Sequence, residues 1–417
     1  MKLAIDSQLA NKALILKTIY ENAPISRINL SQAVSLNKAT VSNITADFLE
    51  KKLIAEGEDV LSSNGRKSTG LVLNMGAFSS IVIRINRNHI LSGVYDMDEK
   101  LHHFRRSHYI NSLDIKSIIS QIEDEINNQI RYCKSAHKEI LGISIASLGY
   151  LYIIDEKYSL KADGFKTLGD ADICNEIRKR FPKYRVIMNH DANAAAMAEM
   201  RSFIKKEGYR PSPLLNVVGG IGLGGGIVID GKIVLGHNGI AGEIGHMGMN
   251  CFIPYKGING DIRFKRGIYE EYASPLAIQR TIIENLYDYP KSILTEESSL
   301  EDIYKAYDAG DSLAEWAVNR MARFLAYGLT GLIFILDPEV IVLGDQIPRS
   351  KKFTATLSKF LDDFLPKELR SRLIIRFSEF EEDSSLIGAG VMLFEDVLSS
   401  GAILDSVASY YKDSEKT

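Results

Sequence analysis

Cysteine is scarce in this chain of 417 residues, and Cys133, Cys174 and Cys251 show no paired spacing. An odd number without a repeated interval predicts neither a disulfide framework nor a zinc site built from cysteines alone. We therefore expect a protein of a reducing compartment, the cytoplasm.

Long apolar runs are also missing. The longest weakly polar stretch, residues 214–229, is interrupted by six glycines and is too short to cross a bilayer. The first twelve residues lack the apolar core and small-residue cleavage site of a secretory signal. The sequence predicts no membrane span and no membrane partner.

Charge of one sign is not in excess either, because 50 Lys and Arg stand against 53 Asp and Glu. Such a chain does not coat nucleic acid as a polycation, so any contact with DNA must be local. Proline is sparse, and 45% hydrophobic with 25% charged residues is typical of a folded globular protein. At roughly 150 residues per domain, the length predicts two or three domains.

Residues 1–75 form the first distinct segment. They hold nine basic and seven acidic residues, whereas the remainder of the chain is acidic overall. Apolar spacing and capping signals predict three helices followed by two strands. The helices are expected over residues 8–22, from the N-cap Ser26 to 33, and from 38 to about 52, and the strands over 53–56 and 71–73.

The third predicted helix has an apolar face made of Val41, Ile44 and Phe48. Small, polar and basic side chains occupy the opposite face, which suits reading of the major groove, because bulky groups would hold a helix away from base edges. The residues expected to contact DNA here are Asn37, Lys38, Ala39, Thr40, Ser42 and Asn43, with Lys38, Ser42 and Asn43 reading bases.

A basic loop joins the two predicted strands. Gly65 stands beside Arg66 and Lys67 there, a composition that suits a wing lying on phosphates or in a minor groove. Arg66 and Lys67 are the expected wing contacts. The pattern alone leaves open a small helical domain with a solvated basic loop and no DNA.

Three short sequence motifs in this segment favour DNA binding. Residues 24–27 (PISR), 36–42 (LNKATVS) and 64–67 (NGRK) together resemble the winged helix-turn-helix of xylose-repressor-type regulators.

Strands and helices alternate from residue 81 onward. Short apolar runs at 81–85, 140–146 and 186–188 are separated by helical segments at 115–132 and 171–180. This alternation predicts an α/β domain with a buried sheet. A second α/β unit is expected from Leu214 to about Val391, and two lobes around a cleft form a natural small-molecule site.

Six sequence motifs, most of them in the second half of the chain, are typical of one protein family. The chain resembles the ROK family (repressors, open reading frames, kinases), sugar-binding members of the actin-like ATPase superfamily, over nearly its whole length. The motifs that carry the resemblance are 189–195 (NHDANAA), 220–231 (GIGLGGGIVIDG), 239–247 (GIAGEIGHM), 266–274 (RGIYEEYAS), 336–344 (LDPEVIVLG) and 387–390 (IGAG).

The resemblance implies an α/β fold class: an N-terminal winged helix-turn-helix followed by a two-lobed actin-like ATPase (ROK, ribonuclease H-like) fold. The expected domains are the DNA-binding domain at 1–75, an N-terminal lobe at 76–200 and a C-terminal lobe at 201–417.

A polyhydroxyl ligand needs fixed donors and acceptors, because each unpaired buried polar group costs about 1–3 kcal/mol. The resemblance implies that Asp191 contacts the sugar and, in the kinases, acts as the base. Glu243, His246 and Glu270 occupy other sugar-contact positions of the family. His190 stands where the family usually has asparagine and completes the predicted sugar-binding set. The alternatives are a helix cap for Asp191, surface positions for the glutamates and a packed histidine at 190.

Both phosphate-binding motifs of the family's kinases are altered in this chain. Residues 84–88 (RINRN) stand where the kinases have an acid and two glycines that bind phosphate, with Arg84 in place of the acid, and Ile221 replaces a threonine. We therefore expect no catalytic residue, no cofactor and no phosphoryl transfer, and we expect glycines 220–226 to form a tight hairpin turn.

The family's structural zinc is also not expected. Only His246 and Cys251 remain of four ligands, with Ile268 at the last cysteine position. Residues 250–265 are expected to pack through Phe252, Ile253, Tyr255 and Phe264 instead.

The leading hypothesis is a cytoplasmic transcriptional repressor of carbohydrate-utilisation genes that is not an enzyme. Its predicted partners are operator DNA, a small sugar effector and further copies of itself in a homodimer or homotetramer. Two alternatives remain at this point: an ATP-dependent sugar kinase with an appended DNA-binding domain, and a regulator that has lost ligand sensing and answers to a protein partner.

Overall fold

The computed structural model describes residues 2–61, 67–109, 114–154, 157–161, 172–220, 222–256, 262–381 and 384–404. The chain folds as two compact units. The first comprises residues 1–149, 156–189 and 389–417, and the second comprises residues 150–155 and 190–388. None of the helices in the described ranges is long and apolar enough to cross a bilayer.

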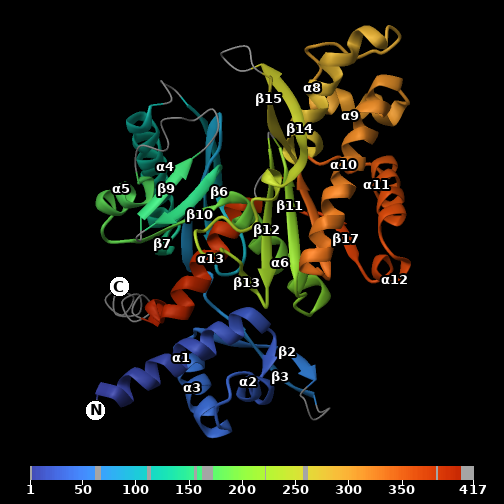
Figure 1. Ribbon diagram of the computed structural model, residues 1–417. Coiled ribbons are helices and arrows are strands. Elements are labelled where there is room, and N and C mark those ends of the chain that lie inside the picture. Colours follow the sequence, from blue (N-terminus) through green and yellow to red (C-terminus); the bar gives the residue numbers. More distant parts are fainter. Residues whose placement is uncertain are drawn as a thin grey trace. The chain divides into compact units, whose positions relative to one another are not determined.

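Three helices and a small sheet begin the first unit (Figure 1). The helices are α1 (Lys2–Asn22), α2 (Arg27–Ala33) and α3 (Lys38–Glu50), and the sheet has the order β1-β3-β2 with β1 (Ile25–Ser26), β2 (Ile54–Leu61) and β3 (Lys67–Leu73). The Oγ of Ser26 accepts a hydrogen bond from the N–H of Asn29, which confirms Ser26 as the cap of α2. All three predicted helices are confirmed, although α1 is longer than expected.

The main sheet of the first unit has the strand order β10-β7-β4-β5-β6. Its strands are β4 (Phe78–Ile85), β5 (His89–Asp96), β6 (Leu101–His108), β7 (Glu139–Ser147) and β10 (Arg185–His190), and its helices are α4 (Ile115–Ser135) and α5 (Ile173–Arg180). Every residue of the central strand β4 is buried. The short strands β8 (Tyr150–Ile154) and β9 (Lys157–Lys161) follow β7 in the chain.

The sheet of the second unit repeats this topology. Its order is β13-β12-β11-β16-β17, from β11 (Leu214–Gly219), β12 (Leu223–Ile229), β13 (Lys232–Ile233), β16 (Val340–Asp345) and β17 (Ile374–Phe377). In each sheet the first three strands in chain order are antiparallel neighbours, and the fourth pairs parallel with the first. This duplication supports the predicted actin-like fold class for the region after residue 75.

Helices cover both faces of the second sheet (Figure 1). On one face α6 (Asp191–Glu207) packs against β11 and β12. On the other face Leu215, Val217, Ile341 and Leu343 join a large apolar core with the longer helices. The remaining elements are α7 (Glu270–Ala273), α8 (Pro275–Asn285), α9 (Leu300–Ala309), α10 (Ser312–Leu336), α11 (Lys351–Phe364), α12 (Lys367–Arg370), the 3-10 turns η2 (Ile244–His246) and η3 (Leu286–Asp288), and the hairpin strands β14 (Gly248–Lys256) and β15 (Ile262–Ile268).

The tight hairpin expected at glycines 220–226 is present, with Gly220 and Gly222 in its turn, and the glycines within β12 additionally serve close packing. A Cβ on Gly226 would lie 2.5 Å from the Cβ of Ala196 on α6, and a Cβ on Gly225 would lie 2.9 Å from the carbonyl oxygen of Gly242. The described glycines between 219 and 226 all have φ outside the left-handed region. The β11–β12 hairpin itself is confirmed.

The compact units divide near residues 190 and 388. Because α6 packs on β11 and β12, the whole helix belongs to the second unit. The helix α13 (Ser384–Ser400) belongs from residue 389 to the first unit, where the ring of Phe394 stacks on Tyr95 with centroids 5.7 Å apart. The ring of Tyr20 in α1 forms a T-shaped pair with Phe394, with centroids 6.2 Å apart.

Candidate functional site

The start of α6 carries the first two residues of the candidate site. His190 is the N-cap of α6, yet its side chain makes no capping hydrogen bond. Its imidazole is buried, at 8% exposure, with Nε2 3.5 Å from Oδ1 of Asp191 and 3.7 Å from Oε1 of Glu243. Asp191 is the first helical residue rather than the cap, so the positive end of the helix dipole stabilises its carboxylate.

Two further loops of the second unit supply the rest. Glu243 immediately precedes η2, and His246 ends that turn. Glu270 opens α7, where its Oε2 accepts a hydrogen bond from the N–H of Leu223 at 3.4 Å. The Nε2 of His246 lies 3.9 Å from Oε1 of Glu270.

Two glycines make room for Glu270. A Cβ on Gly222 would lie 2.6 Å from Oε2 of Glu270, and a Cβ on Gly245 would lie 3.0 Å from the same atom. The glycines of the two neighbouring motifs therefore fix where this carboxylate stands.

The structure brings together all five residues of the predicted sugar-binding set. We call them the acid–histidine cluster: His190, Asp191, Glu243, His246 and Glu270. Burial raises the pKa of Glu243, His190 opposes this shift, and the carboxylates of Asp191 and Glu270 add to it. The histidine nitrogens and carboxylate oxygens of the cluster lie 3.5, 3.7 and 3.9 Å apart, at or beyond the limit of a hydrogen bond. Carboxylates accept and imidazoles also donate hydrogen bonds, so the cluster holds both kinds of group for a polyhydroxyl ligand.

Asn193 is a neighbour of the cluster that the sequence did not single out. Its side chain is 2% exposed, and its Oδ1 has no hydrogen-bond partner among the described residues. This oxygen lies 3.8 Å from where a Cβ on Gly242 would stand, so it faces the segment that carries Glu243. A lone amide in an alanine-rich helical turn was the signal that could have found it.

The predicted DNA-contacting residues lie at and beyond the start of α3. Asn37, Lys38, Ala39, Ser42 and Asn43 are exposed, Thr40 is half-buried, and the apolar face of α3 is buried as predicted. Asn37 also has a local role, because its Oδ1 accepts a hydrogen bond from the N–H of Thr40 and caps the helix. Lys67 is exposed at the start of β3, and Arg66 lies outside the described residues.

Two segments correspond to the phosphate-binding and zinc-binding motifs of the family. Arg84 is buried within β4, and residues 86–88 form the turn that leads into β5. Ile221, like the side chains of Cys251, Phe252, Ile253, Tyr255 and Phe264, lies outside what the structure describes. Among the residues that the structure describes, no group of three or more His, Cys, Asp or Glu is placed to hold a metal ion.

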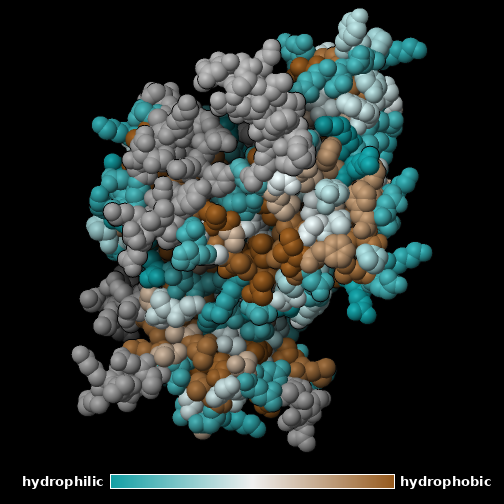
Figure 2. Space-filling view, in the orientation of Figure 1, coloured by the Kyte–Doolittle hydropathy of each residue, from teal (hydrophilic) through white to brown (hydrophobic). Residues whose placement is uncertain are grey.

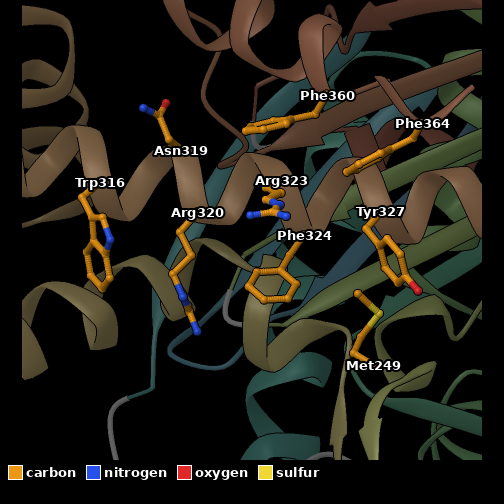
Figure 3. Close-up of a pocket in the computed structure, with 9 residues that line it drawn as sticks. All are labelled: Met249, Trp316, Asn319, Arg320, Arg323, Phe324, Tyr327, Phe360 and Phe364. Atoms are coloured by element: carbon orange, nitrogen blue, oxygen red, sulfur yellow. The ribbon is translucent and has the colours of Figure 1, made fainter. Parts of the chain in front are cut away.

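An open groove of about 890 Å³ lies along α10. Figure 3 shows Phe360 and Phe364 extending from α11 toward α10, where Arg323, Phe324 and Tyr327 project into the same space. The guanidinium of Arg320 lies 5.1 Å from the ring centre of Phe324. No carboxylate is among the described residues that line this groove.

The exposed face of α10 continues beyond the groove. Phe334 and Ile335 are 63% and 75% exposed, and a Cβ on Gly331 would have nothing within 4 Å. Figure 2 shows apolar surface on one face of the molecule. On α10, Tyr327, Gly331, Phe334 and Ile335 follow one another at helical spacings, and we call these four residues the α10 stripe.

Comparison with known proteins gives consistent matches. The model of the ROK family matches residues 81–396. The xylose repressor of Caldicellulosiruptor bescii is 27% identical over 93% of this chain and 96% of its own length. The DNA-binding transcriptional dual regulator NagC of Escherichia coli K12 is 25% identical over 93% of each chain.

Solved structures share the fold. A ROK family transcriptional regulator, described as a homolog of the E. coli MLC protein, superposes with a TM-score of 0.74 at 23% identity and covers 96% of this chain and 99% of its own. A ROK family glucokinase from Streptomyces griseus, in complex with glucose and AMPPNP, reaches a TM-score of 0.60 at 20% identity and covers 75% of this chain and 98% of its own.

Proposed function

The chain belongs to the ROK family, and from this we propose that it is a sugar-responsive transcriptional repressor of carbohydrate-utilisation genes. The observation that carries the proposal is the acid–histidine cluster, in a chain whose N-terminal segment presents an exposed polar helix face. The xylose repressor and NagC match 93% of the chain, whereas the glucokinase covers 75% of it. This difference in coverage favours a regulator.

The DNA-binding part of the proposal concerns residues 1–75. We assign them a winged helix-turn-helix with α3 as the recognition helix and the β2–β3 hairpin as the wing. The exposed side chains of Lys38, Ser42 and Asn43 support base contacts in the major groove, and the exposed Lys67 supports a phosphate contact.

The sensing part concerns the two ROK lobes, assigned to residues 76–200 and 201–417. The acid–histidine cluster binds the sugar. A ligand alters DNA binding only if it binds one conformation more tightly than another, because equal affinity shifts no equilibrium. In a dimer, such a shift changes the separation of two DNA-binding segments and so the fit to two operator half-sites.

The ROK domain is assigned a non-catalytic role. The turn between β4 and β5 supports this assignment, because residues 86–88 (NRN) include no glycine that would let the backbone approach a phosphate closely. The second candidate is a sugar kinase with an appended DNA-binding segment, favoured by Asp191 standing at the start of a helix beside Glu243. ATP consumption with candidate sugars, abolished by Asp191→Asn, would establish that candidate.

We further assign the exposed stripe of α10 to the contact between copies in a homodimer or homotetramer. The stripe combines large apolar side chains with Gly331, and because Gly331 has no side chain, a second helix can approach α10 closely there. Exposed apolar surface of this kind marks association sites on proteins.

The test of the proposed function is fluorescence anisotropy of the purified protein on DNA from beside its own gene, at fixed salt. We expect tight binding to one fragment that a particular sugar releases or strengthens. Absence of sequence-specific binding would refute the repressor, and binding that no sugar alters would refute the sensing role. Salt is held constant because phosphate contacts dominate the affinity.

A further inference from the structure

Helix α13 takes part in both compact units. Its residues 384–388 belong to the second unit and residues 389–400 to the first, so the chain passes from one unit to the other inside a continuous helix. The motif 387–390 (IGAG) lies at this crossing and contributes two glycines to it. These residues are part of neither the acid–histidine cluster nor the DNA-binding segment.

The first glycine fits α13 against the helix that carries Asp191. A Cβ on Gly388 would overlap the carbonyl oxygen of Ala194 in α6 and lie 3.1 Å from the Cα of that residue. The backbones of the two helices are therefore in direct contact. Ala194 lies within one helical turn of Asp191, so a movement of the start of α6 reaches α13 directly.

The second glycine and a phenylalanine fit α13 into the first unit. A Cβ on Gly390 would lie 2.9 Å from the Cγ of Tyr95 in β5, so this ring packs against the backbone of α13. One helical turn later, Phe394 stacks on the same ring. Phe394 and Tyr95 are fully buried. Two glycines of one motif therefore fix the same helix in both units.

Phe394 also contacts the first helix of the DNA-binding segment, through its T-shaped pair with the buried Tyr20 of α1. In turn, α1 packs against α2, α3 and β3. The Nζ of Lys12 in α1 lies 2.7 Å from the Oδ2 of Asp47 in α3. Through α1, the ring of Phe394 is thus connected to the helix that we assign to base reading.

We propose that Phe394 is the positioning residue that makes DNA binding depend on the sugar site. When a sugar shifts the start of α6, the tight contact at Gly388 moves α13 with it, and Phe394 carries the movement through Tyr20 to α1 and α3. Closely packed contacts switch between discrete arrangements rather than deform continuously. This inference rests on the proposed function and assigns its coupling to one aromatic contact.

The experiment measures the coupling between sugar and operator in the full-length protein. Operator affinity is determined by anisotropy with and without whichever of D-xylose, D-glucose and N-acetyl-D-glucosamine binds the wild type. The ratio of the two dissociation constants is the coupling factor, which is typically about 5–150 in allosteric proteins. We expect Phe394→Leu to lower this factor several-fold toward 1. Sugar affinity without DNA, from calorimetry, should stay within about twofold, because Phe394 is not part of the acid–histidine cluster.

A reciprocal measurement distinguishes lost coupling from damaged DNA binding. Operator DNA should change the sugar affinity of the wild type by the same factor, since coupling between two binding sites is reciprocal. This change should be diminished equally in Phe394→Leu. The matched control is Phe353→Leu, an equally buried phenylalanine in α11 of the second unit, which should leave the coupling factor unchanged.

A coupling factor that Phe394→Leu leaves unchanged would overturn the inference and leave the repressor in place, as would an equal loss in Phe353→Leu. If circular dichroism shows that Phe394→Leu does not fold, Tyr20→Leu, which removes the other ring of the pair, decides by the same criteria. Absence of operator binding, or of any sugar effect on it, in the wild type would instead remove the proposed function and this inference with it.

Discussion

A Cβ on Gly222 would lie 2.6 Å from the Oε2 of Glu270, so the carboxylate of Glu270 can occupy its position only because residue 222 has no side chain. We predict that Gly222→Ala displaces Glu270 and weakens sugar binding by about tenfold, equivalent to about 1.4 kcal/mol. Calorimetry with the sugar that binds the wild type measures the loss. Gly220→Ala is the control, because its Cβ would meet its nearest neighbour at an ordinary 3.5 Å, and equal losses in both variants would contradict the prediction.

The exposed face of α3 gives a prediction about DNA. We expect Lys38→Ala to weaken binding of the preferred operator and relax the preference for one base pair, by about 1–3 kcal/mol, because a base contact is lost. We expect Lys67→Ala to weaken all sequences alike and lower the slope of log affinity against log salt by about 1, because a phosphate contact is lost. Competition anisotropy over several salt concentrations distinguishes the two effects.

Lys359→Ala, at an exposed position in α11, should alter neither quantity. If Lys38→Ala left the operator preference unchanged, Lys38 would not contact a base. The exposed face of α3 would then be interpreted as a solvated helix surface.

Glu199 makes stability depend on pH. Its carboxyl is buried on α6 and accepts a hydrogen bond from the Oγ of Ser378, and burial raises its pKa to about 7. Because the folded pKa lies above the unfolded value of 4.5, the unfolded state ionises first as pH rises. Stability is therefore highest below about pH 4.5 for this group and is lost up to about pH 7, by on the order of 3 kcal/mol.

The measurement is urea unfolding of the wild type and Glu199→Gln between pH 4.5 and 8. The wild type should lose stability relative to the variant as pH rises through this range. Glu301→Gln, on the surface of α9, should track the wild type, and a pH-independent difference between Glu199→Gln and the wild type would refute the assignment.

The α10 stripe gives a prediction about assembly. Phe334→Glu places a charge in the middle of a proposed apolar contact, so the assembly should dissociate and the weight-average mass should fall toward the monomer value of 46.4 kDa. Sedimentation equilibrium measures this mass. Tyr287→Glu, at a 95% exposed position in η3, is the control, and an unchanged mass for Phe334→Glu would move the contact elsewhere.

Local signals in the sequence were reliable. Ser26 caps α2 as its side-chain chemistry predicts, because capping depends only on residues within one turn of the helix. The proximity of Asp191, Glu243 and Glu270 is of another kind, since these residues lie far apart in the chain and only the family resemblance brought them together.

Features that depend on distant parts of the chain were missed. The role of Gly226 follows from the position of Ala196 on α6, which no local pattern contains. β1 has only two residues, too few for any periodicity. On α10, Leu332 is buried and Phe334 is exposed, and hydrophobicity alone cannot tell which face of such a helix another element covers.

The contact of Phe394 with Tyr95 and Tyr20 has a consequence for the order of folding during synthesis. The ribosome delivers residues 1–149 first, but the first unit receives most of α13 only after residues 190–388 have been synthesised. Residues 190–388, which lie between these parts in the chain, leave the ribosome together and can fold as a unit beforehand. A nascent chain halted before residue 389 would therefore carry a complete second unit and a first unit still lacking the ring on which Tyr20 and Tyr95 pack.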